Sequence, residues 1–309
     1  MKLNQKKNTN TMNKTTGTSN EVLEYYSKNW DKIANCYALD EEGYPVDPAW
    51  YRRRLYQQFL KENKPTSVLD IGCGGGWTVL DALQLGIKAR GIEPVKELKE
   101  FGCDLIEKNG FDRSCIKQDD LAVLATLPDA SEDCIALLSV IPHVPRENWD
   151  QVHNDIVRVL KPGGKLIVAY RNELFDLFTF NSITVEFYDR SLWNSNEFDS
   201  LHNTESIDLL KGLMTNPDLP GQYFTAAQDK SFGKLDRKKS NPFTIEAFLA
   251  QYGLSWKRSQ FYHFHSVPPL MQDKVKGIKK MNHEAGINLA DDWRGNFMCP
   301  MFLVTAEKK

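Results

Sequence analysis

A glycine-rich turn follows a short apolar run and has the composition of a ligand-binding loop. The run Ser67–Ile71 predicts a strand, and Gly72, Gly74 and Gly76 come directly after it, ahead of a predicted helix. Glycine lets a backbone pass close to a ligand and adopt positive φ without steric cost. A strand, a glycine turn and a helix in this order form the phosphate- or nucleoside-binding start of a doubly wound fold. We therefore expect a nucleoside-type ligand here, with Asp70 beside it.

The glycine spacing separates two classes of cofactor. A dinucleotide fingerprint, G-x-G-x-x-G, that starts at Gly72 and Gly74 needs a third glycine at position 77. That position is Trp77, so the dinucleotide pattern fails. Glu93 lies 21 residues after Gly72, at the end of the next predicted strand, where its carboxylate can accept hydrogen bonds from both ribose hydroxyls. Dehydrogenases also carry such an acid, so Glu93 alone does not separate the two classes.

A histidine follows a continuous apolar run in the middle of the chain. Residues 134–140 predict a strand covered on both faces. The segment from Ser139 to Pro145 should then lie at the carboxyl edge of the sheet, with His143 held in a stiff loop between two prolines. An imidazole, with its ordinary pKa near 6.5, suits a general base that deprotonates a hydroxyl. His143 is our catalytic candidate, and a residue that only orients the substrate or anchors the loop is the alternative.

Three polar residues on or directly after later predicted strands are candidates for substrate binding. Arg171 directly follows the predicted strand 165–170, where its charge suits an anionic substrate. His263 and His265 alternate along the predicted strand 255–265 and should share one face. Two histidines on one face can bind a metal with a third ligand, but no acid or cysteine follows at a suitable distance. We expect packing or substrate contact from both histidines, and no metal.

Aromatic and basic residues mark the two helices predicted before the glycine turn. The first, residues 21–38, carries Tyr26, which we expect to close over the cofactor as part of a lid. Simple packing of an amphipathic helix is the alternative. The second helix, residues 50–61, contains the run Arg52–Arg54. Such a run is usually a solvated face, with one member free to pair with a carboxylate.

Strands and helices alternate between residues 67 and 170, which predicts βαβ units and right-handed crossovers. The alternation stops at about residue 172 and resumes near 241, an interval too long for a plain loop. The expected fold class is α/β: a Rossmann-like, doubly wound, mostly parallel seven-stranded sheet with N-terminal helices and an inserted cap after strand five. The predicted strands are residues 67–71, 89–92, 114–117, 134–140, 165–170, 255–265 and 301–306.

This organisation divides the chain into consecutive parts. We expect a disordered tail over residues 1–20, a helical lid over 21–64, the cofactor-binding core over 65–171, a substrate cap over 172–240, and the last helix and final antiparallel strands of the core over 241–309.

Composition restricts the classes of partner. The net charge is −2 over 309 residues, without a basic stripe, so no field attracts nucleic acid. No apolar run approaches the ~20 residues that span a bilayer. The six cysteines are scattered without a Cys-x-x-Cys pair, which favours free thiols in a reducing compartment. We therefore expect a cytoplasmic protein that contacts neither nucleic acid nor membrane. The sequence does not indicate an oligomeric state.

Four segments in register resemble class I S-adenosylmethionine-dependent methyltransferases, over residues 67 to about 170. A fifth segment, residues 127–133, departs mildly, because Glu132 stands where the family usually has an aromatic residue. The four segments are VLDIGCGGG at 68–76, GIEP at 91–94, QDDL at 118–121 and LKPGGKL at 160–166.

The resemblance implies S-adenosylmethionine as cofactor. By the family pattern, the turn containing Asp70 and Cys73 holds the methionine part and Glu93 holds the ribose. Asp119 or Asp120 meets the adenine amino group, and we favour Asp120 because an acid followed by leucine is the commoner form. Ser139, at the end of strand four, is expected next to the transferred methyl.

The implied activity is methyl transfer to an oxygen or nitrogen of a small-molecule acceptor, such as a metabolite or a sugar-like compound. A nucleic-acid methyltransferase is one alternative, but amino-directed enzymes of that kind carry Asn- or Asp-Pro-Pro-aromatic after strand four. This chain has residues 141–144, IPHV, at that place. A non-catalytic S-adenosylmethionine-binding protein is the other alternative. The identity of the acceptor is not readable from the sequence.

Overall fold

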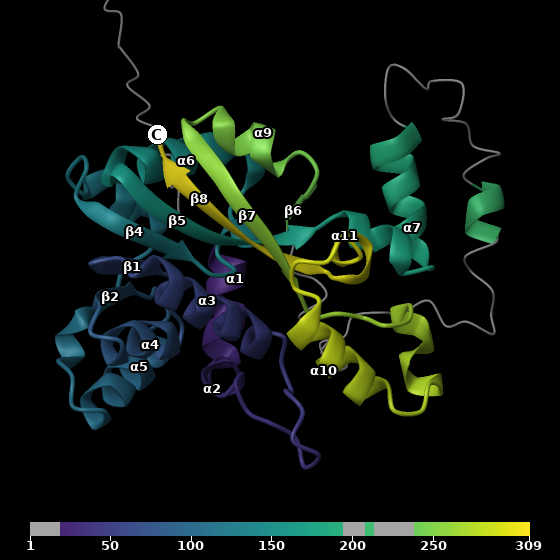
Figure 1. Cartoon of the computed structure of the whole chain (residues 1–309), viewed down its shortest axis with the longest axis horizontal. Helices are drawn as coiled ribbons and strands as arrows, with labels where there is room; N and C mark the ends of the chain where they lie inside the picture. The colour runs from purple at the N-terminus through teal and green to yellow at the C-terminus, as the bar shows by residue number, and fades with distance from the viewer. Residues whose placement is uncertain (1–18, 194–207, 213–237) are drawn as a thin grey trace, which may run out of the picture.

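One sheet organises the chain in the computed structural model, which describes residues 19–193, 208–212 and 238–309 (Figure 1). Its strand order is β3-β2-β1-β4-β5-β8-β7, with the short β6 paired to β5 off this path. The strands are β1 (Ser67–Ile71), β2 (Lys88–Ile92), β3 (Ile116–Lys117), β4 (Glu132–Leu137), β5 (Leu160–Asn172), β6 (Lys239–Ser240), β7 (Leu254–Tyr262) and β8 (Met301–Lys308).

The direction of the strands changes at β8. Strands β1 to β5 pair in parallel, for example Asp70 with Gly91 and Ile135 with Leu166. Strand β8 runs antiparallel between β5 and β7. This confirms the predicted Rossmann-like, mostly parallel sheet, and β6 adds a short strand that the sequence pattern did not indicate.

Helices cover both faces of the sheet because alternate side chains of each strand point to opposite faces. Leu69 and Leu137 pack in the core cluster that includes helix α6, whereas Val68 and Ala136 pack in the cluster that includes helix α3. In Figure 1, α6 and α9 lie above the sheet, and α3, α4 and α5 lie below it. These helices are α3 (Ala49–Asn63), α4 (Trp77–Gln84), α5 (Lys96–Lys108), α6 (Trp149–Val159) and α9 (Ile245–Ala250).

The single helix predicted over residues 21–38 is wrong. Two helices, α1 (Asn20–Lys28) and α2 (Trp30–Ala34), meet at Asn29, whose φ of −117° and ψ of 20° are not helical. The Asn29 side-chain amide and its backbone N–H both donate to the Tyr25 carbonyl, at 2.9 and 3.1 Å, and so cap the end of α1.

Two predicted strand ends are also corrected. Strand β4 stops at Leu137 and not at residue 140, because Ser139 has a φ of 75°, which a strand does not accommodate. Strand β7 stops at Tyr262 for the same reason, since His263 has a φ of 64°. The third predicted strand loses residues 114–115 to a 3-10 turn, Arg113–Cys115.

The proposed tail and cap lie largely outside the described residues. Within the predicted cap, the structure describes a 3-10 helix, Leu174–Phe178, helix α7 (Ser182–Phe187), a π-helical turn, Tyr188–Trp193, a helical stretch at 208–212, and β6.

None of the helices in the described ranges has the length and hydropathy to cross a bilayer. The remaining elements are the 3-10 helices Leu121–Thr126, Ile141–His143, Arg146–Asn148 and Pro269–Lys274, and helices α10 (Ile278–Asn288) and α11 (Gly295–Met298).

Candidate cofactor and acceptor site

The glycine turn after β1 is fixed by the neighbouring strand. The N–H groups of Gly72 and Cys73 both donate to the Ile92 carbonyl, at 2.7 and 3.1 Å. Gly72 has a φ of 71°, and a Cβ there would lie 2.5 Å from a methyl of Val140. Gly74 has a φ of 55°, but a Cβ there would meet no described atom within 4 Å. The turn therefore needs glycine for its shape and leaves the backbone of Gly74 open on one side.

Glu93 lies against this turn and is 5% exposed. Its two carboxylate oxygens accept hydrogen bonds from the N–H of Gly74 at 2.8 Å and of Val95 at 3.0 Å. Burial raises the pKa of Glu93 to about 7, and these two N–H donors act in the opposite direction. The structure thus brings together the acid and the turn that the sequence singled out separately.

Asp70 is a second buried carboxyl below the turn, 1% exposed. The Thr78 hydroxyl donates to its Oδ2, while Oδ1 has no hydrogen-bond partner within the described ranges. Burial raises the pKa of Asp70 to about 7; the Thr78 bond and the charge of Arg52 lower it, and the charge of Glu93 adds to the rise. Two buried carboxyls with raised pKa values therefore lie at the site.

Arg52 on α3 reaches the same place and was missed as a functional candidate. Its Nη1 donates to the Ser139 hydroxyl at the end of β4. Its charge lies close enough to Asp70 and Tyr262 to lower the pKa of both groups. The signal was present in the helical period, because Arg52 is three and four residues before the buried Leu55 and Tyr56.

Of the run Arg52–Arg54, the solvated face is wrong for Arg52, whereas the pairing of one member with a carboxylate is confirmed at Arg53. Arg53 donates to both carboxylate oxygens of Asp81, at 2.7 and 2.8 Å. Its guanidinium also lies 4.7 Å from the ring centre of Tyr37 and 4.9 Å from that of Trp77. Only Arg54 is exposed.

The N-terminal helices pack over the glycine turn. The Trp77 indole N–H donates to the Ala34 carbonyl of α2 at 2.9 Å. A Cβ on Gly75 would lie 3.1 Å from the Phe101 ring and 3.4 Å from the Ala34 Cα. Helix α2 thus contacts both the turn and the first residue of α4.

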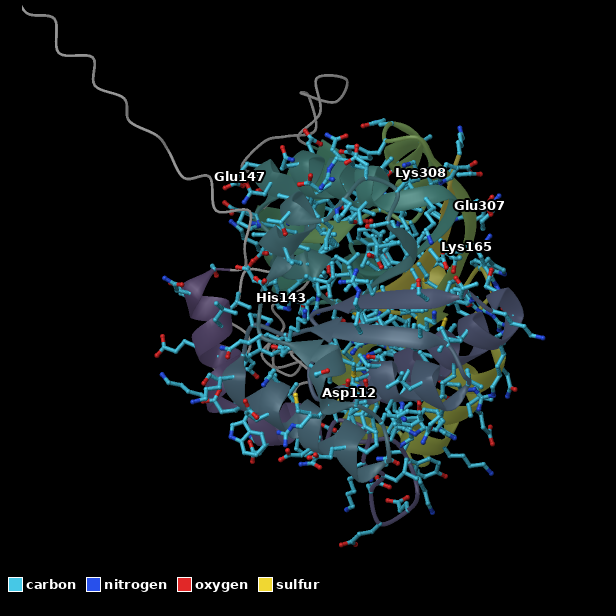
Figure 2. All side chains as sticks on the ribbon, turned by 90° about the vertical axis from the view of Figure 1, so that its left-hand side faces the viewer. Asp112, His143, Glu147, Lys165, Glu307 and Lys308 are labelled. Atoms are coloured by element: carbon cyan, nitrogen blue, oxygen red, sulfur yellow. The ribbon has the colours of Figure 1, made fainter. Side chains whose placement is uncertain are left out.

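His143 lies at the end of a 3-10 turn after β4, Ile141–His143. Its Nε2 is 3.1 Å from the Tyr26 hydroxyl of α1, and the two rings meet edge to face with centres 5.5 Å apart. Figure 2 shows His143 beside the N-terminal helix, at the opposite end of the strands from Lys165 and Glu307. Tyr26, predicted to contact the cofactor, therefore contacts the catalytic candidate.

Arg171 and Tyr262 lie in one row across the sheet, with Met301 of β8 between them. Arg171 of β5 pairs with Met301 of β8, which pairs with Tyr262 of β7. Ala169, Met301 and Tyr262 belong to the core cluster on the α3 face, so Arg171, two residues after Ala169, points to that face. Its guanidinium is close enough to Tyr26 and Tyr262 to interact electrostatically with both side chains. Arg171 thus joins the site at the carboxyl edge.

His263 and His265 follow β7 and do not lie on it, but they still meet. Their ring centres are 4.5 Å apart, and His265 packs 5.0 Å from Phe175. Burial and the charge of Arg171 lower the pKa of His263 to about 4, so its imidazole is neutral at pH 7. The side-chain amide of Gln272 bonds Nδ1 of His265. Within the described ranges, no group of three or more His, Cys, Asp or Glu side chains could hold a metal ion.

Cys73 and the two acids predicted near the adenine, Asp119 and Asp120, make other contacts in the structure. The Cys73 thiol is buried against Gly91 and Val79, so its side chain points into the core and only its backbone faces the turn. Asp120 caps the 3-10 helix Leu121–Thr126 by accepting from the N–H of Ala122 at 2.7 Å. Asp119 is exposed and accepts from the N–H of Asp120 at 2.9 Å. Both acids stay candidates for adenine.

The residues present fit an adenosyl cofactor. The backbone at Gly74 is open where a ligand would pass, and the adjoining Glu93 carboxylate offers acceptor sites beyond its two backbone bonds. Trp77, at the position where a dinucleotide fingerprint needs its third glycine, bonds α2 through its indole N–H.

Comparison with known proteins agrees with this geometry. Residues 69–168 match the family described as a methyltransferase domain. The chain is 33% identical to a sterol 4-C-methyltransferase of Caenorhabditis elegans over 161 residues, which is 52% of this chain and 43% of that protein. It is 28% identical to a Saccharomyces cerevisiae tRNA(Thr) (cytosine(32)-N(3))-methyltransferase over 45% of this chain and 23% of that protein. The chain thus spans less than half the length of either relative.

The fold is also that of a solved methyltransferase. Magnesium protoporphyrin IX methyltransferase from Synechocystis, with bound S-adenosylhomocysteine, superposes with a TM-score of 0.53 at 13% identity, over 93% of this chain and 98% of that one. The matched domain covers the glycine turn, Glu93 and the segment of His143. Residues 69–168 are thus a methyltransferase domain, similar to those of the class I S-adenosylmethionine-dependent methyltransferases.

Proposed function

We propose that this protein transfers a methyl group from S-adenosylmethionine to a hydroxyl or amino group of a small molecule. The observation that carries the proposal is the buried Glu93 carboxylate, held against the glycine turn by the N–H of Gly74. A carboxylate fixed at that point can accept hydrogen bonds from ribose hydroxyls without moving. Asp70 and the backbone of the turn hold the amino acid part, and Asp119 or Asp120 meets the adenine.

The chain's own residues orient the acceptor and handle its proton. When bound, the cofactor supplies an electrophilic methyl carbon, which takes the acceptor's lone pair while the electron pair of the breaking carbon–sulfur bond stays on sulfur. Positioning of the two partners accounts for most of the acceleration, roughly 7 to 11 kcal/mol in well-oriented systems. His143 takes the proton from a hydroxyl acceptor, and the Tyr26 hydroxyl, 3.1 Å from Nε2, fixes the ring.

A small acceptor is favoured over nucleic acid by charge. The chain carries 39 Lys and Arg against 41 Asp and Glu, whereas nucleic-acid binding relies on a basic surface. The similarity to a sterol methyltransferase supports the same choice. Because a relative acts on tRNA, RNA belongs among the acceptors to be assayed.

The test is cofactor selectivity. Isothermal titration calorimetry should show S-adenosylmethionine and S-adenosylhomocysteine binding at about micromolar Kd, and NAD should not bind. At a hundredfold excess over Kd, S-adenosylhomocysteine should stabilise the folded protein by about 2.7 kcal/mol. Binding of NAD together with no response to S-adenosylhomocysteine would reject the proposal.

A further inference from the structure

Arg171 stands out among the charged groups of the site because it has no ion-pair partner in the part of the chain that the structure describes. Its side chain is half-buried at the end of β5. Within residues 19–193, 208–212 and 238–309 its guanidinium has no hydrogen-bond or ion-pair partner. An arginine stays protonated in proteins, so this is a lasting positive charge at the site. A half-buried guanidinium without an ion-pair partner in these ranges keeps its donors for a bound anionic group.

The nearest acidic group is used elsewhere. Asp176 is 4% exposed and its charge acts on Arg171. Both of its carboxylate oxygens, however, accept hydrogen bonds from Lys239, at 2.6 and 2.8 Å, and Arg190 lies 3.9 Å away. Lys239 therefore serves as the principal counter-ion of Asp176, and the guanidinium of Arg171 keeps its donors for another group.

The neighbours of Arg171 suit an anion of single charge. His263 is close enough for the charge of Arg171 to act on it, and its ring has no hydrogen-bond partner within the same ranges. A neutral imidazole adds a donor without adding charge. Arg52, the other arginine here, already bonds Ser139 and has Asp47 and Asp70 nearby. One uncompensated positive charge matches one negative charge.

We propose that the methyl acceptor carries a carboxylate, separate from the hydroxyl or amine that is methylated, and that Arg171 binds this carboxylate with His263 beside it. The planar guanidinium fork matches the two oxygens of a carboxylate. Tyr26 connects the two ends of the bound acceptor, because it lies near Arg171 and its hydroxyl bonds His143. This inference rests on the proposed function, since it names the substrate class of the same site.

The experiment measures carboxylate binding on protein saturated with S-adenosylhomocysteine. Acetate, benzoate and phenylacetate are titrated, each beside its primary amide, by calorimetry. We expect at least one carboxylate to bind more tightly than its amide. Arg171→Gln should weaken that binding roughly ten- to a hundredfold, and Arg171→Lys should restore part of it. Arg54→Gln, an equal change of charge at an exposed position of α3, should leave it unchanged.

Several outcomes would overturn the inference. Equal binding of acids and amides by the wild-type protein would do so, as would unchanged carboxylate binding in Arg171→Gln. A large fall in the melting temperature of Arg171→Gln, rescued by Arg171→Lys, would show that a carboxylate of the chain itself neutralises Arg171. Retained binding of S-adenosylhomocysteine in these cases would leave the proposed function standing, whereas its loss in the wild-type protein would reject both.

Discussion

Charged side chains are paired at the amino ends of the parallel strands, whereas several buried polar atoms at the carboxyl ends have no partner in the described ranges. At the amino end, Lys165 lies 2.6 Å from Glu307 and Lys161 lies 2.6 Å from Asp133, and Arg90 pairs with Glu132. At the carboxyl end the charges are less completely matched: Oδ1 of Asp70 and the Nε of Arg52 are buried without hydrogen-bond partners in the described ranges, and so is the hydroxyl of Tyr262. Figure 2 shows the Lys165–Glu307 end and the His143 end on opposite sides of the molecule.

This contrast separates residues that hold the fold from residues that bind ligands. A partly exposed ion pair contributes about 0 to 1 kcal/mol and gives no reason to bind anything else. A buried polar atom without a partner costs about 1 to 3 kcal/mol, and a ligand that supplies the missing partner recovers part of that cost. The carboxyl end is therefore less stable alone than it is with its ligands.

The largest effect is expected at His143. His143→Ala should keep the affinity for S-adenosylhomocysteine and lower the turnover rate about a hundredfold or more, because the acceptor's proton loses its base. Single-turnover kinetics with labelled S-adenosylmethionine measures the chemical step directly.

Two companion variants distinguish a base from a residue that only orients the acceptor. Tyr26→Phe removes the hydroxyl that bonds Nε2 but keeps the ring contact, so it should slow the reaction only a few-fold. His143→Gln can still form hydrogen bonds but cannot take up a proton at neutral pH. Near-normal turnover in His143→Gln would show that the histidine is not the base.

A smaller effect is expected at Glu93. Glu93→Gln should weaken cofactor binding by about 1 to 3 kcal/mol, because a neutral amide replaces a charged acceptor of the ribose hydroxyls. Glu107→Gln, on the exposed side of α5, is the matched control and should bind normally. If both variants bound S-adenosylhomocysteine like the wild type, the ribose would have to lie elsewhere.

The same carboxylate makes cofactor affinity depend on pH. Burial raises the pKa of Glu93 to about 7, so lowering the pH below 7 protonates the group and removes its charge. Affinity should then fall by up to about tenfold per pH unit, and the fall should be shallower in Glu93→Gln. Asp70, whose pKa is also raised to about 7, accounts for the pH dependence of affinity that remains in Glu93→Gln. Calorimetry between pH 5 and 8 measures both slopes.

The smallest effect is expected at the amino end. Glu307→Gln removes the partner of Lys165 and should lower the free energy of unfolding by less than about 1 kcal/mol, without changing turnover. The Lys165 bond lowers the pKa of Glu307, so this difference should be present at neutral pH and vanish as acid protonates the carboxylate. Urea denaturation of both proteins, at neutral pH and at a pH acidic enough to protonate Glu307, checks the sign of this difference in stability. A loss of activity here would contradict the separation between the two ends.

Local sequence patterns were sufficient for the parts of the fold that are built locally. The strand Ser67–Ile71 and the turn after it follow from an apolar run and glycines, and the structure has both. The breaks at Asn29, Ser139 and His263 escaped prediction, because a non-glycine residue with unusual backbone angles is imposed by packing and leaves no compositional signal.

The site needed contacts that only the folded chain makes. Arg52 looked like part of a solvated charge run, yet it reaches Ser139, 87 residues further along the chain. His143 and Arg171 could be placed at the carboxyl edge from strand order. That Arg171 lacks an ion-pair partner among the described residues, however, depends on Lys239 binding Asp176. Chain distances of this size lie beyond any helical or strand periodicity.

The position of β8 between β5 and β7 has a consequence for biosynthesis. The pairing of Lys165 with Glu307 joins residues 142 positions apart, so one edge of β5 stays open while the ribosome adds everything between them. Contacts of such long range are slow to form, and an open strand edge pairs readily with other chains. We expect nascent chains stalled before β8 to aggregate or require a chaperone, and folding to be completed only after β8 has left the exit tunnel.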